Sequence, residues 1–162
     1  MRLCRSTLTL LAACAAQAAA AQAAGSFATP ARDLAALDIA SSNLIVSRLG
    51  AECLALVGRP ETPKAFVADW QQRNARYVNA SAKYLDRRIE QAAAEGKREQ
   101  ALAEVRSVIQ RNADATLGKL LQGRKEEACM NAITLSDTGA LDISPKLPQY
   151  EQIEALARWA EQ

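Results

Sequence analysis

The chain has 162 residues, with 20 Lys and Arg, 18 Asp and Glu, four cysteines and no histidine. The lack of histidine excludes Ser-His-Asp and Cys-His catalysis and removes the commonest protein ligand for transition metals. No glycine-rich phosphate loop, Cys-x-x-Cys pair or calcium-loop spacing is present, so we expect no cofactor and no metal. The length suits one domain with one hydrophobic core.

The first 23 residues have the three parts of an export signal. Arg2 and Arg5 precede an apolar stretch, and Ala21-Gln22-Ala23 provides a small-residue cleavage site. The stretch is too short and too rich in alanine for a permanent membrane-spanning helix, which needs about 20 strongly apolar residues. We therefore predict a signal peptide over residues 1–23, a single helical domain over residues 24–162, and a periplasmic or secreted location.

A second interpretation of the N-terminus stays open. The stretch Leu11-Ala12-Ala13-Cys14 is similar to the lipobox of bacterial lipoproteins, in which the cysteine is lipidated and becomes the first residue. Lipidation of Cys14 would hold the protein at a membrane. The apolar run before Cys14 is short for such a signal, so simple cleavage is the favoured prediction, and the mass of the mature N-terminus distinguishes the two.

Removal of the signal changes the charge balance. The segment contains Arg2 and Arg5 and no acidic residue, so the remaining chain has 18 basic and 18 acidic residues. Nucleic-acid binding depends on many uncompensated Lys and Arg contacts to phosphate. We therefore expect no nucleic-acid partner for this neutral domain.

Two cysteines remain after the signal, Cys53 and Cys129. Two thiols in an oxidising compartment are expected to pair. In the chain-entropy model a bridge across so long a loop contributes roughly 4 kcal/mol of stability. We predict a structural Cys53–Cys129 disulfide, because a redox or metal-binding pair would need a Cys-x-x-Cys spacing or a neighbouring histidine.

Helical periodicity runs through the mature chain, and no segment shows sustained strand alternation. Thr29-Pro30 and Thr62-Pro63 each place a capping threonine before a proline that suits the first helical turn. We expect three long helices, beginning at Pro30, at Pro63 and after Lys97, and two shorter ones, beginning at Lys125 and Pro148. The predicted fold is all-α, a bundle of three long and two shorter helices whose first and fourth members are tied by one disulfide.

The expected helix boundaries follow from glycines and prolines. The first helix should end at Gly58, the second should run unbroken to about Glu95-Gly96, and the third should end by Gly123. Gly50, inside the first helix, suits a close crossing of another helix. The apolar positions expected to face inward on the first helix are Leu34, Leu37, Leu44, Leu49, Cys53 and Leu56.

The second helix carries the pattern of greatest functional interest. It contains four of the seven aromatic residues, and three of them recur every seventh position, which keeps them on one side of a helix. Polar residues fall on the same side at alternating steps of four and three. We call this set the helix stripe; its members, with Arg73 at the edge, are Trp70, Arg73, Asn74, Tyr77, Ser81, Tyr84 and Arg88.

Two interpretations of the helix stripe are open. Burial of Asn74, Ser81 or Arg88 without a partner would cost about 1–3 kcal/mol each, so the stripe must either meet polar partners in the core or face a groove. An aromatic stripe at helical spacing is more often core. A groove lined by Trp, Tyr and Arg would suit a partner protein or a small anionic or aromatic ligand.

The sequence thus favours a non-enzymatic binding protein of the bacterial envelope that uses the exposed part of the helix stripe. Binding through the stripe requires Tyr77 and Arg88 to be partly exposed. One alternative is a metal-free enzyme that uses Arg73, Arg88 and a nearby acid. Another is a structural or assembly accessory protein.

Overall fold

The computed structural model describes residues 27–162, and within them the chain forms six α-helices and no strand. The predicted signal peptide lies outside the described residues. The all-α class is confirmed, but one more helix is present than the five expected. The helices are α2 (Pro30–Cys53), α3 (Pro63–Arg73), α4 (Ala75–Ala94), α5 (Arg98–Leu120), α6 (Lys125–Asp137) and α7 (Tyr150–Ala160).

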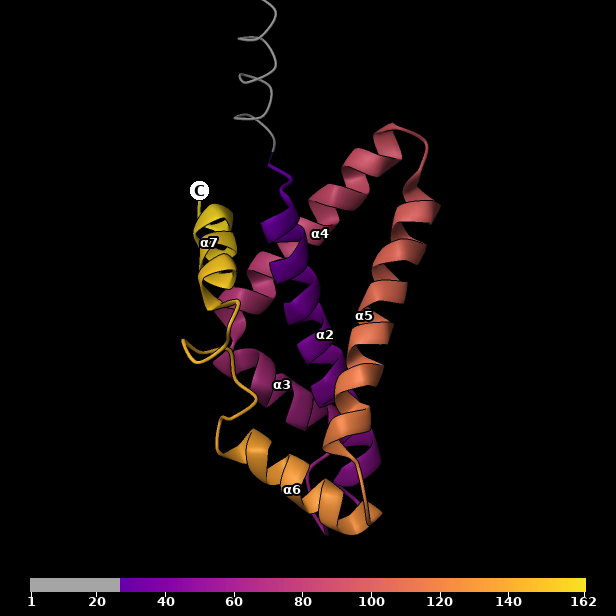
Figure 1. Cartoon of the computed structure of the whole chain (residues 1–162), viewed down its shortest axis with the longest axis vertical. Helices are drawn as coiled ribbons and strands as arrows, with labels where there is room; N and C mark the ends of the chain where they lie inside the picture. The colour runs from indigo at the N-terminus through magenta and orange to yellow at the C-terminus, as the bar shows by residue number, and fades with distance from the viewer. Residues whose placement is uncertain (1–26) are drawn as a thin grey trace, which may run out of the picture.

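Helix α2 is the central element, in contact with each of the other five helices (Figure 1). Helix α2 begins where the Thr29-Pro30 pair predicts. The Thr29 side chain accepts a hydrogen bond from the backbone N–H of Arg32 at 3.3 Å, and Pro30 occupies the first turn. Helix α7 packs near the N-terminal end of α2, and α6 crosses near its C-terminal end. The two ends of α2 therefore have different neighbours.

The prediction of one helix from Pro63 to Glu95 is wrong, because the chain breaks at Asn74. The backbone of Asn74 has φ −107° and ψ 18°, which ends α3 and starts α4 in a new direction (Figure 1). The break is held by the Asn74 side chain, whose oxygen accepts a hydrogen bond from the backbone N–H of Ile143 at 2.8 Å. This partner lies in the connector between α6 and α7, far away in sequence.

The predicted inner face of α2 is wrong at both ends. Leu34 is 64% exposed, and Leu56 is 43% exposed because the helix ends at Cys53 and Leu56 lies in the following turn. The small residues Ala35 and Ala36 are buried instead, which lets α4 and α7 pack close to the backbone of α2.

Gly50 lies where α2 meets α3, as expected for a close crossing. A Cβ atom at this position would lie 3.1 Å from Cδ1 of Phe66 and 3.4 Å from Cα of Pro63. A larger residue would therefore push α3 away from α2.

The predicted disulfide is confirmed. Cys53, the last residue of α2, is bonded to Cys129 of α6 across a sequence separation of 76 residues, with a Cα–Cα distance of 5.1 Å. Both cysteines are fully buried. Such a bond is consistent with an oxidising compartment.

No helix of residues 27–162 combines the length and apolar character needed to cross a membrane.

The core has two parts, one at each end of α2. The first surrounds the disulfide and includes Leu49, Trp70, Leu117 and Ile133. The second lies under α7 and includes Ile39, Tyr84, Ile153 and Leu156. Val78 of α4 and Ile143 of the connector pack against both parts, so the middle of the molecule joins the two.

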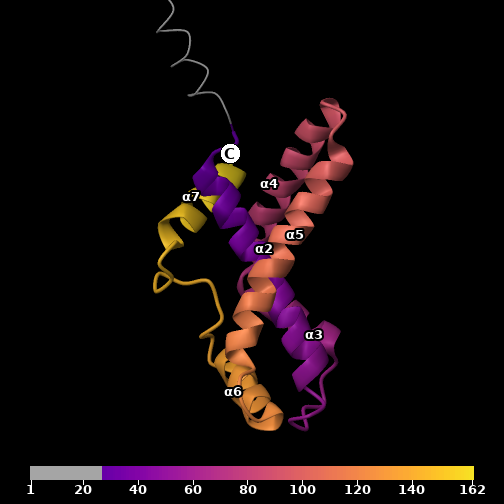
Figure 2. The same ribbon diagram turned by 45° about the vertical axis from the view of Figure 1, so that its right-hand side comes forward.

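The tip of the α4–α5 hairpin lies outside both parts of the core. The two helices are joined at Gly96, which has a φ of +72°, and their joined ends project away from α2 (Figure 2). No residue between positions 85 and 112 is buried, although apolar residues continue at helical spacing. Buried residues return on α5 only at Ala113 and Leu117, where the helix reaches the disulfide end.

Candidate functional site

The helix stripe is divided by the break at Asn74. Trp70 and Arg73 belong to α3, whereas Tyr77, Ser81, Tyr84 and Arg88 belong to α4. The stripe passes from the disulfide end of the core to the side of the α4–α5 hairpin. Its members therefore lie in several different environments.

The first part of the helix stripe is core. Trp70 has no exposed surface, and its indole N–H donates to the backbone oxygen of Leu141 at 3.0 Å. Asn74 is 2% exposed, and its amide nitrogen donates to the Trp70 backbone oxygen at 2.9 Å and to Oδ1 of Asp142 at 3.2 Å. With the bond from Ile143, these contacts fasten the α6–α7 connector to the α3–α4 junction.

Arg73 lies at the edge of this junction and is tied to acidic residues. Its Nε atom is 3.0 Å from Oδ2 of Asp142, its Nη2 atom donates to the backbone oxygen of Ser136 at 3.3 Å, and it also pairs with Asp69. The hydrogen bond that Arg73 donates to the Asp142 carboxylate raises the pKa of Arg73. Arg73 lines a shallow pocket of about 290 Å³ beside Arg59.

Tyr77 fastens α7 to α4. Its hydroxyl lies 3.0 Å from the Tyr150 hydroxyl and donates to Oε2 of Glu154 at 3.2 Å. Burial, together with the bond to Tyr150, raises the pKa of Tyr77 to about 12. Arg76 pairs with Glu154 and Glu161, each at 2.7 Å, and its hydrogen bonds lower the pKa of both carboxyls. Tyr77 remains partly exposed.

The last part of the helix stripe passes from core to surface. Ser81 is buried and donates to the backbone oxygen of Ala36 at 2.7 Å. Tyr84 is fully buried, and its hydroxyl donates to Oδ1 of Asp33 at 2.8 Å; burial and this bond raise its pKa to about 12. The same Asp33 oxygen lies 3.2 Å from Nε of Arg88, whose side chain is 40% exposed.

Arg88 opens onto the largest of the described pockets, which we call the hairpin groove. This pocket of about 380 Å³ lies between α2, α4 and the first half of α5. Its polar residues include Arg88, Asp33, Lys97 and Glu104. Its apolar lining includes Leu37, Leu85, Ile89, Val105 and Val108.

The hairpin groove was only partly visible in the sequence pattern. The sequence pattern predicts Arg88 as a site residue but does not single out Leu85 or Ile89. The signal for them is the apolar spacing of Leu85, Ile89 and Ala92 on the side of α4 next to the stripe. Helical spacing alone does not show that this apolar side lacks a covering helix.

A second pocket, of about 310 Å³, contains an acidic residue that the sequence did not single out. Asp38 lies there beside Ser41, Ser42 and Gln149, under the α6–α7 connector. Burial raises the pKa of the Asp38 carboxyl. The sequence around Asp38 does not distinguish it from a solvent-exposed acidic residue of α2.

The residues named for the enzymatic alternative lie apart. Arg73 and Arg88 line different pockets, and no described pocket contains both. Within residues 27–162, no group of three His, Cys, Asp or Glu side chains is arranged to hold a metal ion.

Comparison of the chain with protein-family models, with curated proteins and with solved structures gave no match.

Proposed function

We propose that this protein is a non-enzymatic binding module of the bacterial envelope, and that it holds an amphipathic helix of a partner protein in the hairpin groove. The observation that carries the proposal is the lack of any buried residue between positions 85 and 112, in two helices with regularly spaced apolar residues. Apolar sides of helices are normally covered by another element. A partner helix laid along the hairpin would cover them.

The spacing of the groove residues supports a helical partner. Two rows of apolar side chains, spaced four and three residues apart along their helices, line the hairpin groove, as in helix-in-groove recognition. One row comes from α4 and the other from α5. They consist of Leu85, Ile89 and Ala92, and of Ala101, Val105 and Val108.

The charges of the groove favour a partner helix with a basic side chain. Arg88 is paired with Asp33 at 3.2 Å, and Lys97 is paired with Glu95 at 3.0 Å. Glu104 lines the groove and has no ion-pair partner among the described residues. Because Arg88 is already engaged, a small anionic ligand would have to compete with Asp33, which makes the helical partner the better supported occupant.

The proposal is tested by site-specific photo-cross-linking in cells that export the protein. A photoreactive residue replaces Val108, which is half-buried in the groove; the control has the same residue in place of Leu56, which is exposed at the other end of α2. We expect a discrete adduct with another protein from position 108 and none from position 56. Ile89→Asp should abolish the adduct without unfolding the protein, since Ile89 is only partly buried.

Other results would contradict the proposal. An adduct between two copies of the chain would make the groove a self-association surface, and equal labelling from both positions would mean non-specific contact.

The proposed periplasmic or secreted location is checked on the same sample by the mass of the mature N-terminus. Cleavage after Ala23 predicts that the mature chain begins at Ala24, and lipidation predicts that it begins at Cys14.

A further inference from the structure

A cluster of aromatic rings and of basic residues without a carboxylate partner lies on the other side of α2 from the hairpin groove. We call it the cationic-aromatic face; it consists of Phe27, Arg32, Lys83, Arg87 and Trp159. The rings of Phe27 and Trp159 are stacked at 6.1 Å between centroids. Both rings are partly exposed. Tyr84 supports them from below, edge-on to Trp159 at 5.4 Å.

Three cations converge on these rings. The Arg87 guanidinium lies 4.6 Å from the ring centroid of Phe27, and Arg32 and Lys83 lie 5.8 and 5.7 Å from that of Trp159. The electron-rich ring faces attract the cations and hold them above the rings.

None of the three cations has a carboxylate partner among the described residues. Residues 1–26 contain no Asp or Glu that could supply one. The nearby carboxylates of Asp33 and Glu161 are paired with Arg88 and Arg76 instead. The face therefore gathers three cations that have no carboxylate partner. Two of them donate to backbone oxygens instead, Arg32 to Phe27 and Lys83 to Ala160.

We infer that the cationic-aromatic face docks the protein on the anionic headgroups of a phospholipid membrane. Partly exposed Trp and Phe rings suit the boundary between headgroups and acyl chains, and adjacent Lys and Arg suit lipid phosphates. A nucleic-acid surface is disfavoured because binding to it depends on many Lys and Arg contacts to phosphate, and this face has three cations.

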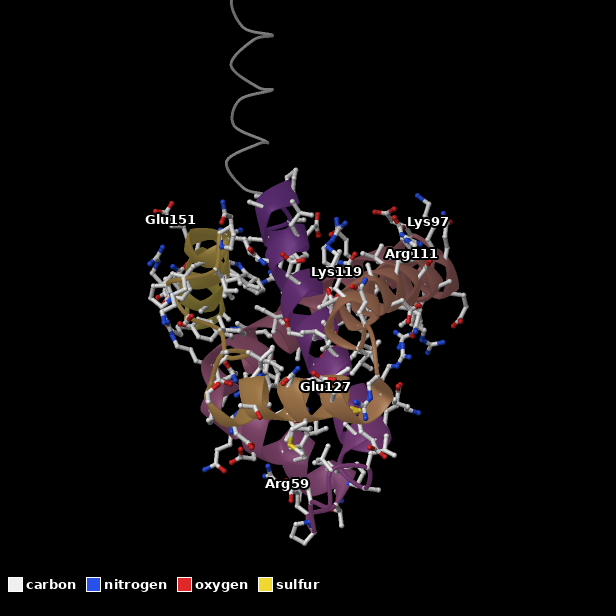
Figure 3. The ribbon with its side chains drawn as sticks, turned by 60° about the horizontal axis from the view of Figure 1, so that its bottom comes forward. Arg59, Lys97, Arg111, Lys119, Glu127 and Glu151 are labelled. Carbon is white, nitrogen blue, oxygen red and sulfur yellow. A yellow bond between two sulfur atoms is a disulfide. The ribbon has the colours of Figure 1, made fainter. Side chains whose placement is uncertain are left out.

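The position of the face supports a membrane as the occupant. Phe27 is where the described chain begins, and Trp159 is close to the C-terminus, so the first and last parts of the described chain lie at the same end of the molecule (Figure 1). Figure 3 shows α7, with Glu151, and the hairpin tip, with Lys97, on opposite sides of α2, so membrane docking would leave the hairpin groove open.

The chain contains a built-in reporter for this contact. Of its two tryptophans, Trp70 has no exposed surface, whereas Trp159 is partly exposed on the face. A change in emission on addition of vesicles therefore reports on Trp159. The protein purified after export is titrated with phosphatidylglycerol vesicles and, separately, with phosphatidylcholine vesicles. We expect a shift of emission to shorter wavelength with the anionic vesicles alone, and its reversal at high salt.

The variant Lys83→Gln/Arg87→Gln removes two exposed cations from the face. The expected loss in partitioning onto anionic vesicles is about 30-fold, since each basic side chain near such a surface contributes about a factor of five. The matched control is Lys119→Gln/Lys125→Gln. It removes the same charge from the opposite end of the molecule, where α5 ends and α6 begins, and should bind like the wild type.

Four outcomes would overturn the inference. These are no binding to phosphatidylglycerol vesicles, equal binding to both kinds of vesicle, equal losses in the two double variants, or the same emission shift with soluble glycerol phosphate. The last would identify a site for a free anion instead of a membrane surface. None of these readouts depends on the hairpin groove, so failure here leaves the proposed function standing, and the reverse also holds.

Discussion

Asn74 illustrates how one residue can decide the direction of the chain. Its side chain uses both amide hydrogens and its oxygen while only 2% of the residue is exposed. Two of its partners, Asp142 and Ile143, lie 68 and 69 residues away. The sequence places Asn74 in the middle of a regular helical pattern, so the break could not be predicted from local spacing.

We predict that Asn74→Ala lowers the free energy of unfolding by about 1–3 kcal/mol, because it leaves the part-buried N–H of Ile143 without its acceptor. The matched control is Asn79→Ala on the exposed side of α4, which should cost less than about 0.5 kcal/mol. Urea unfolding followed by the fluorescence of buried Trp70 measures both. Similar losses in the two variants would show that the Asn74 bonds do not hold the junction.

At the level of elements, the sequence predicts where a helix begins better than it predicts which side of the helix is buried. Thr29 and Thr62 both cap their helices through side-chain oxygens, as their spacing before proline predicts. The inner face of α2 was partly mispredicted because the exposed Leu34 is more apolar than the buried Ala35 and Ala36. Close packing of α4 and α7 selects the smaller side chains there, and this choice depends on neighbours that the local pattern does not contain.

The disulfide joins the last residue of α2 to α6 inside the first part of the core. We predict that Cys53→Ser/Cys129→Ser lowers the free energy of unfolding by about 2–4 kcal/mol, because the unfolded chain regains the freedom of a 76-residue separation. Thermal unfolding with and without reductant measures the effect.

Reductant should lower the stability of the wild type towards that of the double serine variant and leave the variant unchanged. A wild type that is insensitive to reductant, with the bond shown to be cleaved, would contradict the predicted contribution.

At the level of the whole molecule, packing is uneven. Both parts of the core lie along α2, and the hairpin tip has only half-buried apolar residues such as Ile89 and Val105. The polar helix stripe was predicted from spacing, and Tyr77 and Arg88 are indeed partly exposed. The hairpin groove beside it could not be predicted, because a helical pattern shows which side is apolar but not which side is left uncovered by the tertiary fold.

We predict that hydrogen exchange follows this distribution of packing. Backbone amides of residues 89–105 should exchange faster than those of residues 39–53 and 128–133, since few buried contacts oppose local opening of the hairpin tip. Exchange measured by mass spectrometry on the free protein tests this. Equal protection of the three segments would mean that the hairpin opens only with global unfolding.

The stacking of Phe27 on Trp159 has a consequence for the connectivity of the fold. The first and last parts of the described chain are neighbours, so the path of the backbone begins and ends at the same place. A short linker between these ends, with new termini opened in the turn at Gly123 between α5 and α6, would leave every helix intact. The order of the helices along the chain is therefore separable from their arrangement in space, and a circular permutant could carry a fusion at the end of the molecule where α6 lies.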